Sequence, residues 1–408
     1  MKSRGSANTA RRLSKDFSNE RAKSMKALPF EGPRGARADE IPALLELLNP
    51  IFRPATASMA QEHPYMYCAE NSSNLRIMLD NGRPVSHFGC KFWGIRILGV
   101  PLLCCSVGGV GTHPDYRSRN LATTLIKDAE GLCAQKGADI IYVSGSRGLY
   151  VRNGYTKAGR NLVWKVDGVL TAWFKTSGFA LREFQAADLP LLARCCAAEP
   201  VAYERPLEEL RLLVEGRLAR SNPDRFFWVE RSGRKVAFLE IMMGSAGDEL
   251  ILWEYAGDRS AVAAGLAIFM AGQNSSAVTV PVLLDDRQMR ACFEPSGFEP
   301  QVMDHIFEHT LKVPDFGGFM DKMRPALAKR FVGGRLEDFV FKSRDSGGAI
   351  QCKGAELPLK TPDAVAKLIF TGVEAEGLEN CKAVGGAIGE FVRGVFPLPM
   401  VLPGMNYV

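Results

Sequence analysis

The sequence has no CxxC pair and no regular spacing among its ten cysteines. Zinc sites use closely paired ligands, so this spacing argues against a metal site. Two adjacent pairs, Cys104-Cys105 and Cys195-Cys196, lie inside apolar segments. Free cysteine is among the most buried residue types, and free thiols persist in reducing compartments. We therefore expect buried thiols in a cytoplasmic protein.

Long apolar runs are also missing. No stretch approaches the ~20 apolar residues that span a bilayer, so the sequence predicts no membrane span. At 408 residues, with 46% hydrophobic and 24% charged residues, the chain has the composition of a globular protein and is too long for a single ordinary core. We expect two or three domains.

The net charge of +6 is confined to one end of the chain. Residues 1–30 hold eight Lys or Arg residues against two acidic ones, so the remaining residues are formally neutral. The basic segment has no hydrophobic stretch of the kind that a secretory signal needs. We expect residues 1–27 to form a disordered basic tail. The neutral remainder argues against a nucleic-acid partner.

One histidine pair has the spacing of metal ligands on a helix. His305 and His309 stand four apart, but the residues between them alternate as in a strand. At the rise of a strand the two would lie about 13 Å apart, too far to share an ion. The sequence therefore predicts no metal.

The order of elements in the first region is a helix, an antiparallel meander, a second helix and a further strand. The first helix is expected over 37–52 and three strands within 74–79, 85–97 and 102–112. The second helix is expected over 117–136, with Leu121, Leu125, Ala129 and Leu132 on one face and Gly137 as its stop. A buried strand at 139–144, a helical turn at 149–152 and a final strand at 154–164 follow.

The stretch from Val107 to Ala122, VGGVGTHPDYRSRNLA, carries the strongest chemical signal. An apolar, glycine-containing strand leads into a short basic loop that opens a helix. A helix N-terminus offers free N–H groups and a positive dipole end. Arg117 and Arg119 oppose that dipole, so they are poor structural choices there. The pattern favours a pyrophosphate site.

This stretch resembles the signature of the GCN5-related N-acetyltransferase (GNAT) superfamily, Gln/Arg-x-x-Gly-x-Gly/Ala. Here it reads Arg117-Ser118-Arg119-Asn120-Leu121-Ala122, with Asn120 in place of the middle glycine. Asn tolerates a left-handed backbone better than other non-glycine residues. A second GNAT-like segment, Leu149-Tyr150-Val151-Arg152-Asn153-Gly154-Tyr155, follows in the expected order.

A second region repeats this order of elements and closes with a strand over 300–310. Phe293-x3-Gly297-Phe298 corresponds to Tyr150-x3-Gly154-Tyr155, which suggests duplication. The basic loop is missing from this copy, so we expect it to have lost cofactor binding and to wall the substrate site. Glu230, Glu240 and Glu254 in this copy are expected on solvated strand faces, with a pocket for a cationic amine as the alternative.

The whole chain resembles the enhanced-intracellular-survival (Eis) acetyltransferases. The resemblance implies a mixed α/β fold with tandem GNAT units, the second degenerate, followed by a sterol-carrier-protein-like αβ domain. The expected boundaries are 1–27 for the tail, 28–172 for the catalytic GNAT domain, 173–313 for the degenerate one and 314–408 for the last domain.

The resemblance also implies the site. Acetyl-CoA would lie along Val110, Gly111 and Thr112, whose backbone would pair with the pantetheine arm. The N–H groups of the segment after that strand would hold the pyrophosphate; these are Arg117, Ser118, Arg119, Asn120, Leu121, Ala122 and Thr123. Tyr150 would protonate the departing thiolate. The C-terminal carboxylate, here that of Val408, would be the general base, provided that burial raises its pKa.

The activity that these features predict is acetyl transfer from acetyl-CoA to a primary amine of a small molecule or peptide, by direct attack in a ternary complex. Polyamine-like, aminoglycoside-like or lysine-like amines are the acceptors that the resemblance suggests. Two alternatives stay open: a non-catalytic CoA- or lipid-binding module, and transfer of a longer acyl group or of an aminoacyl group from tRNA. A homo-oligomer is left open as well.

Overall fold

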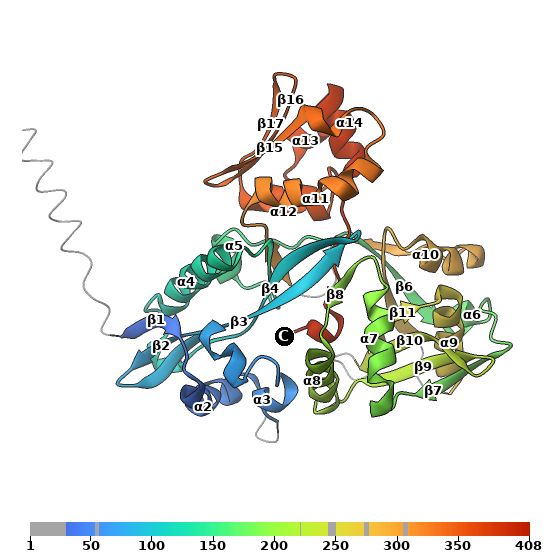
Figure 1. The fold of residues 1–408 in the computed structure, drawn as a ribbon, viewed down its shortest axis with the longest axis horizontal. Helices are drawn as coiled ribbons and strands as arrows, with labels where there is room; N and C mark the ends of the chain where they lie inside the picture. The colour runs from blue at the N-terminus through green and yellow to red at the C-terminus, as the bar shows by residue number, and fades with distance from the viewer. Residues whose placement is uncertain (1–29, 54–56, 221, 244–249, 273–276, 305–308) are drawn as a thin grey trace, which may run out of the picture.

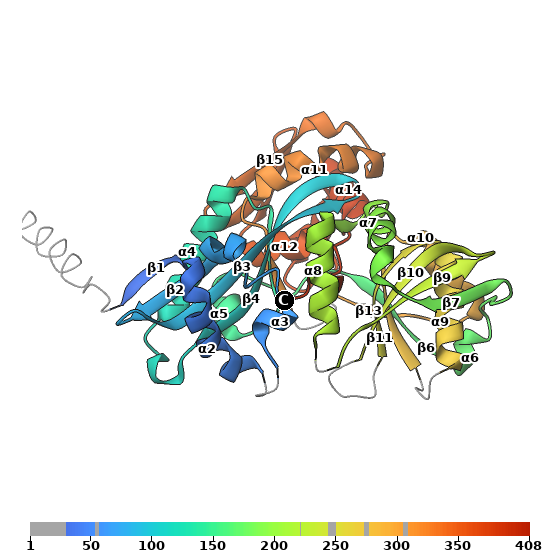
Figure 2. The same cartoon turned by 60° about the horizontal axis from the view of Figure 1, so that its bottom comes forward.

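The computed structural model describes residues 30–53, 57–220, 222–243, 250–272, 277–304 and 309–408. The basic segment 1–27 and His305 lie outside these residues. The chain forms two units built on sheets that stand side by side, with a third, smaller unit across one end (Figure 1). The C-terminus lies in the centre of the molecule, between the first two units (Figure 2).

The first sheet is antiparallel apart from one central pair. Its order is β1-β2-β3-β4-β5-β14, and β8 also pairs with β3. Only β4 and β5 run parallel, as the expected meander with a strand beyond the helix requires. The strands are β1 (Glu31–Gly35), β2 (Leu75–Asp80), β3 (Arg83–Ile97), β4 (Val100–Thr112), β5 (Ile140–Val143), β8 (Ala202–Glu204) and β14 (Thr310–Lys312).

Helices cover this sheet. α2 (Ile41–Phe52) and α3 (Met59–Glu62) contact each other, and α2 packs on β3 and β4. α4 (Leu121–Lys136) begins four residues later than the sequence predicted, and it ends at Gly137 in the left-handed conformation (φ 70°). Its buried face holds Leu121, Leu125, Ile126, Ala129 and Cys133, while Leu132 is only half-buried.

The second sheet has the order β13-β6-β12-β11-β10-β9-β7. Helix α9 (Arg259–Ala271) packs on it, and its stripe of Ala, Leu, Phe and Met side chains is buried. The strands are β6 (Asn161–Asp167), β7 (Phe179–Glu183), β9 (Arg225–Arg231), β10 (Arg234–Met243), β11 (Leu250–Gly257), β12 (Ala277–Leu283) and β13 (Gln301–Met303). The remaining helices of this unit are α6 (Gly168–Thr171), α7 (Leu189–Ala197), α8 (Leu207–Leu218) and α10 (Arg287–Phe293).

The closing strands are exchanged between the two units, which the sequence analysis did not expect. The strand predicted to end the first sheet is β6, and it pairs with β12 and β13 of the second. One strand was predicted over 300–310 to close the second sheet. Its first part is β13, which pairs with β6 of that sheet, and β14 begins at Thr310 and pairs with β5 of the first sheet. A cut between residues 172 and 173 therefore does not separate the two sheets. Strand pairing uses backbone N–H and C=O groups that every sheet offers, so β6 and β14 can each pair in the sheet of the other unit.

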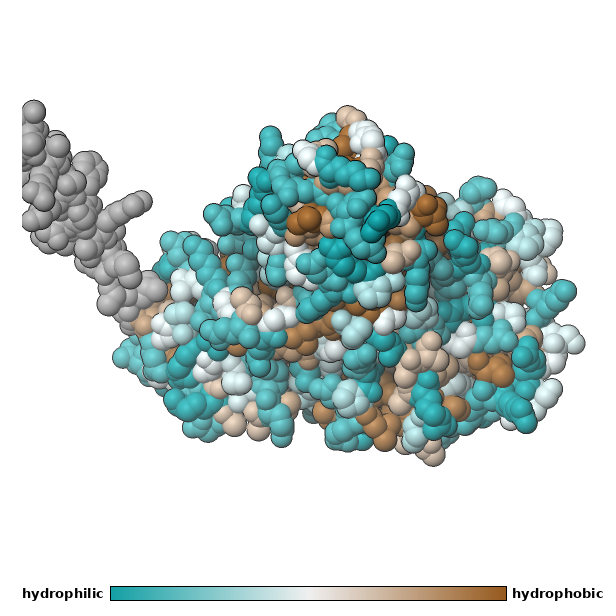
Figure 3. Space-filling model, turned by 45° about the horizontal axis from the view of Figure 1, so that its top comes forward, coloured by the Kyte–Doolittle hydropathy of each residue, from teal (hydrophilic) through white to brown (hydrophobic). Residues whose placement is uncertain are grey.

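The third unit is a three-stranded antiparallel sheet with helices packed on it. Its strands are β15 (Phe339–Arg344), β16 (Gly347–Cys352) and β17 (Ala355–Leu359). Val384 and Gly385 separate its last two helices. The helices are α11 (Phe316–Arg330), α12 (Pro362–Phe370), α13 (Glu379–Ala383) and α14 (Gly386–Val395). Figure 3 shows a mostly hydrophilic surface over this unit, with small, scattered apolar patches.

One core cluster joins all three units. It contains Trp93 of β3, Phe238 of β10, Phe391 of α14 and Met405 of the C-terminal segment, all almost fully buried. Burying a large apolar side chain contributes ~1.5–3 kcal/mol, so this shared core ties the units and the end of the chain into one body.

Candidate active site

A bulge in β4 shapes the first wall of the candidate site. The register between β3 and β4 shifts from His87↔Gly111 to Gly89↔Gly108. Gly109, inside the bulge, has φ +62°, and a β-carbon there would overlap the Tyr67 hydroxyl. The buried His87 donates its Nδ1–H to the Gly109 carbonyl oxygen (2.7 Å), and burial lowers the pKa of His87 to about 4. A neutral imidazole therefore holds the bulge.

After Val107, no strand of the described residues pairs with β4 on the side of β5. The two strands pair in parallel from Cys104↔Ile140 to Val107↔Val143. β5 then ends, and a cavity of about 230 Å³ opens between Val107–Val110 on one side and Ser144, Gly145 and Arg147 on the other. Of the three predicted strand residues, Val110 lines this cavity. Gly111 packs against α2, and the Thr112 hydroxyl is bonded to Ser86 (2.8 Å).

The basic loop leads into a helix N-terminus that no side chain caps. Ser118 (φ 62°) and Asn120 (φ 60°) both adopt the left-handed conformation. The first intrahelical bond runs from Thr124 N–H to Asn120 O (3.0 Å), so the N–H groups of Leu121, Ala122 and Thr123 precede the helical ladder. Orphan donors of this kind are a ready anion site.

The two arginines of the loop lie at the surface. Arg119 stacks over the Tyr116 ring at 5.2 Å and donates to the Asp115 carbonyl oxygen (3.3 Å). Arg117 follows the short 3-10 turn Pro114–Tyr116 and is exposed. The loop therefore presents two guanidinium groups beside the uncapped helix end, and its donor set fits a pyrophosphate.

Tyr150 lies on α5 (Gly148–Arg152) and lines the cavity. Its side chain is buried, and its ring packs edge-on against Tyr155 at 6.2 Å. Burial raises the pKa of Tyr150 above its usual value, so the phenol stays protonated at neutral pH and can donate a proton.

The end of the chain is seated between the first two units. Arg205 donates Nε–H to the Asn406 side-chain oxygen (2.7 Å) and makes a two-point ion pair with Glu254 (2.5 and 2.9 Å). Glu254 in turn accepts the Met405 N–H (3.0 Å). The Gly404 carbonyl oxygen accepts from both Arg217 and Trp253. We call Gly404, Met405 and Asn406, together with these side chains, the tail seat.

The tail seat delivers the last two residues to the cavity. Tyr65 donates its hydroxyl to the Tyr407 carbonyl oxygen (3.3 Å). A β-carbon at Gly108 would lie 2.8 Å from Val408 Cβ, so Val408 rests directly on the bulged strand. Val408 and Tyr150 line the same cavity. The structure thus brings together Val110, Tyr150 and Val408, while residues 117–123 lie at the start of α4 and not in this cavity.

Three arginines that the sequence analysis did not single out also line the cavity: Arg53, Arg147 and Arg220. Arg53 pairs with Glu62 (2.8 Å), and its Nη2 lies 3.0 Å from His63 Nε2. Burial, together with the charges of Arg53, Arg220 and Arg217, lowers the pKa of His63 well below its usual value. Burial and the nearby Arg217 lower the pKa of Arg220 as well. No motif marks these residues, because their neighbours in space are far away in sequence.

The carboxylates of the second unit differ from the prediction of solvated faces. Glu240 is fully buried, and burial raises its pKa well above the usual value despite Arg217 at 3.7 Å. Glu254 belongs to the tail seat and is also mostly buried. Only Glu230, which pairs with Arg182 (3.1 Å), lies at the side of a strand with partial exposure. Within the described ranges, no group of three or more His, Cys, Asp or Glu residues is arranged to hold a metal ion. No helix among these residues is long and apolar enough to cross a bilayer.

A family model decides the nature of the first unit. Residues 33–158 match the model described as "Acetyltransferase (GNAT) domain". The first unit is a GNAT acetyltransferase domain. The match covers the bulged strand, the basic loop and Tyr150.

Solved structures share the fold over nearly the whole chain. A probable N-acyltransferase from Enterococcus faecalis V583, described as a conserved protein of unknown function, has a TM-score of 0.64 at 12% identity over 91% of this chain and 97% of its own. A GCN5-related N-acetyltransferase from Anabaena variabilis has a TM-score of 0.63 at 13% identity over 91% and 98%. Eis1 from Mycobacterium abscessus has a TM-score of 0.59 at 14% identity over 90% and 96%. A search of curated proteins by sequence finds no significant match. The chain therefore shares its fold with these structures over about nine-tenths of its length.

Proposed function

We propose that this GNAT acetyltransferase moves an acetyl group from acetyl-CoA to a primary amine in a ternary complex. The observation that supports the proposal most strongly is the cavity shared by Tyr150 and the C-terminal Val408 beside the bulge of β4. A phenol hydroxyl and the terminal residue therefore line one cavity, next to the part of β4 that lies beyond its pairing with β5.

In this proposal, different groups of the chain bind the cofactor, orient it and transfer protons. The N–H groups at the start of α4, with Arg117 and Arg119, bind a pyrophosphate. The free edge of β4 at Val110 to Thr112 orients the pantetheine arm. Acetyl-CoA supplies the acyl group as a thioester. As the new C–N bond forms and the C–S bond breaks, the Val408 carboxylate accepts a proton from the amine, and the Tyr150 hydroxyl gives one to the sulfur.

The lining of the cavity favours one kind of acceptor. Its charged side chains are those of Arg53, Arg147 and Arg220, and no Asp or Glu side chain of the described residues is among the lining groups. Arg53 pairs with Glu62 (2.8 Å) and Arg220 with Asp224 (3.6 Å). Arg147 is therefore the lining cation that an acceptor would meet. A polycation such as spermidine finds no carboxylate side chain in this lining. We infer that the acceptor carries an anionic group besides its amine, as a lysine-like amino acid or an amino-terminal peptide does.

The third unit carries a proposal of its own. We infer a sterol-carrier-like domain from its three-stranded sheet and packed helices, as the Eis resemblance implies. Its contribution in this chain is to anchor the path of the tail: Leu398 N–H donates to the Ile369 carbonyl oxygen (2.7 Å), and Arg330 donates to the Pro397 carbonyl oxygen (3.0 Å).

The experiment that tests the class is a binding titration with acetyl-CoA, followed by a thiol-release assay over a panel of amines. We expect acetyl-CoA to bind and at least one amine with a carboxylate or phosphate to be acetylated faster than spermidine. Binding without turnover on any amine would favour a CoA-binding module. Faster turnover with longer acyl-CoA donors would reassign the donor.

A further inference from the structure

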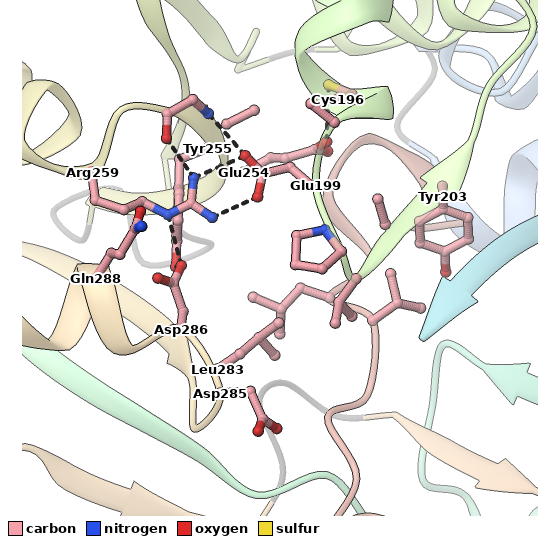
Figure 4. A pocket seen from close by; sticks show the side chains of 18 of the residues that line it. Cys196, Glu199, Tyr203, Glu254, Tyr255, Arg259, Leu283, Asp285, Asp286 and Gln288 are labelled. Carbon is pink, nitrogen blue, oxygen red and sulfur yellow. Dashed lines mark hydrogen bonds and ion pairs between the residues drawn. The ribbon is translucent and has the colours of Figure 1, made fainter. Parts of the chain in front are cut away.

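A second, larger cavity lies in the other half of the molecule. Its volume is about 620 Å³, and it opens between β11, the start of α10 and residues Val401 and Leu402 of the C-terminal segment (Figure 4). Pro200, Val201 and Leu283 add to its apolar walls. Cavities of this size with mostly apolar walls and a few polar groups are typical of small-molecule sites.

The cavity occupies the same place in the second unit as the candidate active site does in the first. β11 and β12 pair in parallel only at Leu250↔Val278 and Ile251↔Thr279, and then they separate. The cavity follows, lined by Trp253 to Gly257 on β11 and by Leu283 and 285–288 after β12. In the first unit the cavity likewise follows the last parallel pair, Val107↔Val143. The two cavities therefore correspond in position within their sheets.

The helix end and the arginine that correspond to the anion site of the first unit are already engaged in this cleft. Asp258 caps α9 and accepts from Ser260 N–H (2.9 Å) and Ala261 N–H (3.2 Å), so the helix end that would face an anion is already occupied. Arg259 donates to Glu199, to Asp286 (2.8 Å) and to the Gly257 carbonyl oxygen (2.8 Å). Four of its five N–H donors are therefore in use. The cleft persists, and its anion-binding groups have been replaced.

The charges that remain favour a cation. Glu199 and Asp286 share the single guanidinium of Arg259, which leaves one negative charge among these partly buried groups. Arg205 and Glu254 cancel each other. At the rim, Asp285 pairs with Arg330 (2.7 Å), and the exposed Arg287 is screened by water. Figure 4 shows Glu199, Arg259 and Asp286 on one side of the cleft and the apolar side chains on the other.

We propose that this cleft is a second ligand site, separate from the candidate active site, for a small molecule with an apolar body and one amino group. The apolar body lies between Leu283, Val201 and the tail, and the amino group faces Glu199 and Asp286. The tail seat separates the two cavities, because Trp253 and Glu254 line this cleft while they hold Gly404 and Met405. An occupant therefore touches the side chains that position the end of the chain.

The test uses dansylcadaverine, which joins an apolar ring system to a primary amine, and dansylamide, which lacks the amine. Binding is followed by fluorescence polarisation on the full chain without acetyl-CoA, so the result does not depend on catalysis. We expect dansylcadaverine to bind at least tenfold tighter than dansylamide. Asp286→Asn keeps an acceptor oxygen for the Met289 N–H and removes the negative charge that faces Arg259 and the Tyr255 hydroxyl, and it should abolish most of this preference.

A steric pair of variants locates the probe. Ala198 is exposed and lines the cleft, whereas its neighbour Ala197 is exposed and does not. Ala198→Trp should weaken dansylcadaverine at least tenfold, and Ala197→Trp should leave its affinity unchanged. Equal binding of the two probes, or binding that neither Ala198→Trp nor Asp286→Asn weakens, would overturn the proposal. So would the absence of binding at millimolar probe.

Discussion

Val408, the last residue, rests on Gly108 of the bulged strand: a β-carbon at Gly108 would lie 2.8 Å from Val408 Cβ and 3.2 Å from its carbonyl carbon. The contact joins the end of the chain to the wall of a cavity that Tyr150 also lines. The terminal carboxylate can occupy this position only because Gly108 has no side chain.

Gly108→Ala tests that dependence. The added methyl group meets a well-anchored tail, so it should displace Val408 from the cavity. Small misplacements of reacting groups cost up to ~100-fold in rate, and we expect kcat to fall at least tenfold. Gly131→Ala is the control, since Gly131 lies on α4 with no atom within 4 Å of an added β-carbon. Unchanged turnover in Gly108→Ala would show that the tail position does not matter.

Tyr150→Phe tests the proton donor. The ring packing against Tyr155 stays, and only the hydroxyl is lost. General acid catalysis contributes ~10²–10⁴-fold, so kcat should fall by about that factor while the affinity for acetyl-CoA is retained. Tyr155→Phe is the matched control, because the ring of Tyr155 packs edge-on against Tyr150 and is not part of the cavity lining. Equal turnover in the two variants would rule out the role.

Asn120 tests the helix start. Because its φ is 60°, Asn120→Gly should keep the loop shape and Asn120→Val should strain it, at a cost of ~1–3 kcal/mol. Isothermal titration should show weaker acetyl-CoA binding only for the valine variant. Asn81→Val, at the β2–β3 turn with φ 48°, should lower stability without changing that affinity. A loss of affinity common to both valine variants would point to general destabilisation.

His87 predicts a pH dependence of stability. Burial lowers its pKa to about 4, below the ~6.5 of an unfolded histidine. The unfolded state therefore binds the proton first, and stability that is complete above pH 6.5 is lost as the pH falls through 4. The loss from this group is about 3 kcal/mol. His87→Asn keeps a donor for the Gly109 carbonyl oxygen but cannot titrate. Denaturant unfolding should show a smaller loss in this variant between pH 6.5 and 4, and parallel curves would contradict the assignment.

Motifs whose residues are neighbours in the sequence could be recognised from the sequence alone. The basic loop and Tyr150 are each recognisable within a few positions, and their roles in binding and catalysis stay predictions. The tail seat could not be found this way: Arg205 and Asn406 are 201 residues apart and Arg217 and Gly404 are 187 apart. The exchange of β6 and β14 was equally invisible, since an apolar edge strand does not specify which sheet it joins.

The burial of Glu240 and Glu254 has the same origin. Alternation along a strand predicts that one face is buried. It does not predict that a guanidinium group from another element lies against that face. Arg205 pairs with Glu254 and Arg217 lies beside Glu240, and these guanidinium groups offset the cost of burying the two carboxylates. Charged residues on strands were therefore read as solvated faces, which is the usual outcome and was wrong for these two.

The central claim is that the C-terminal carboxylate takes the proton from the amine. Semisynthesis of the chain with Val408 as its carboxamide removes the charge and keeps the shape. We predict that the kcat for amine acetylation falls at least 100-fold in the amide, while the dissociation constant for acetyl-CoA stays within twofold of that of the natural chain. Full turnover of the amide would contradict the claim.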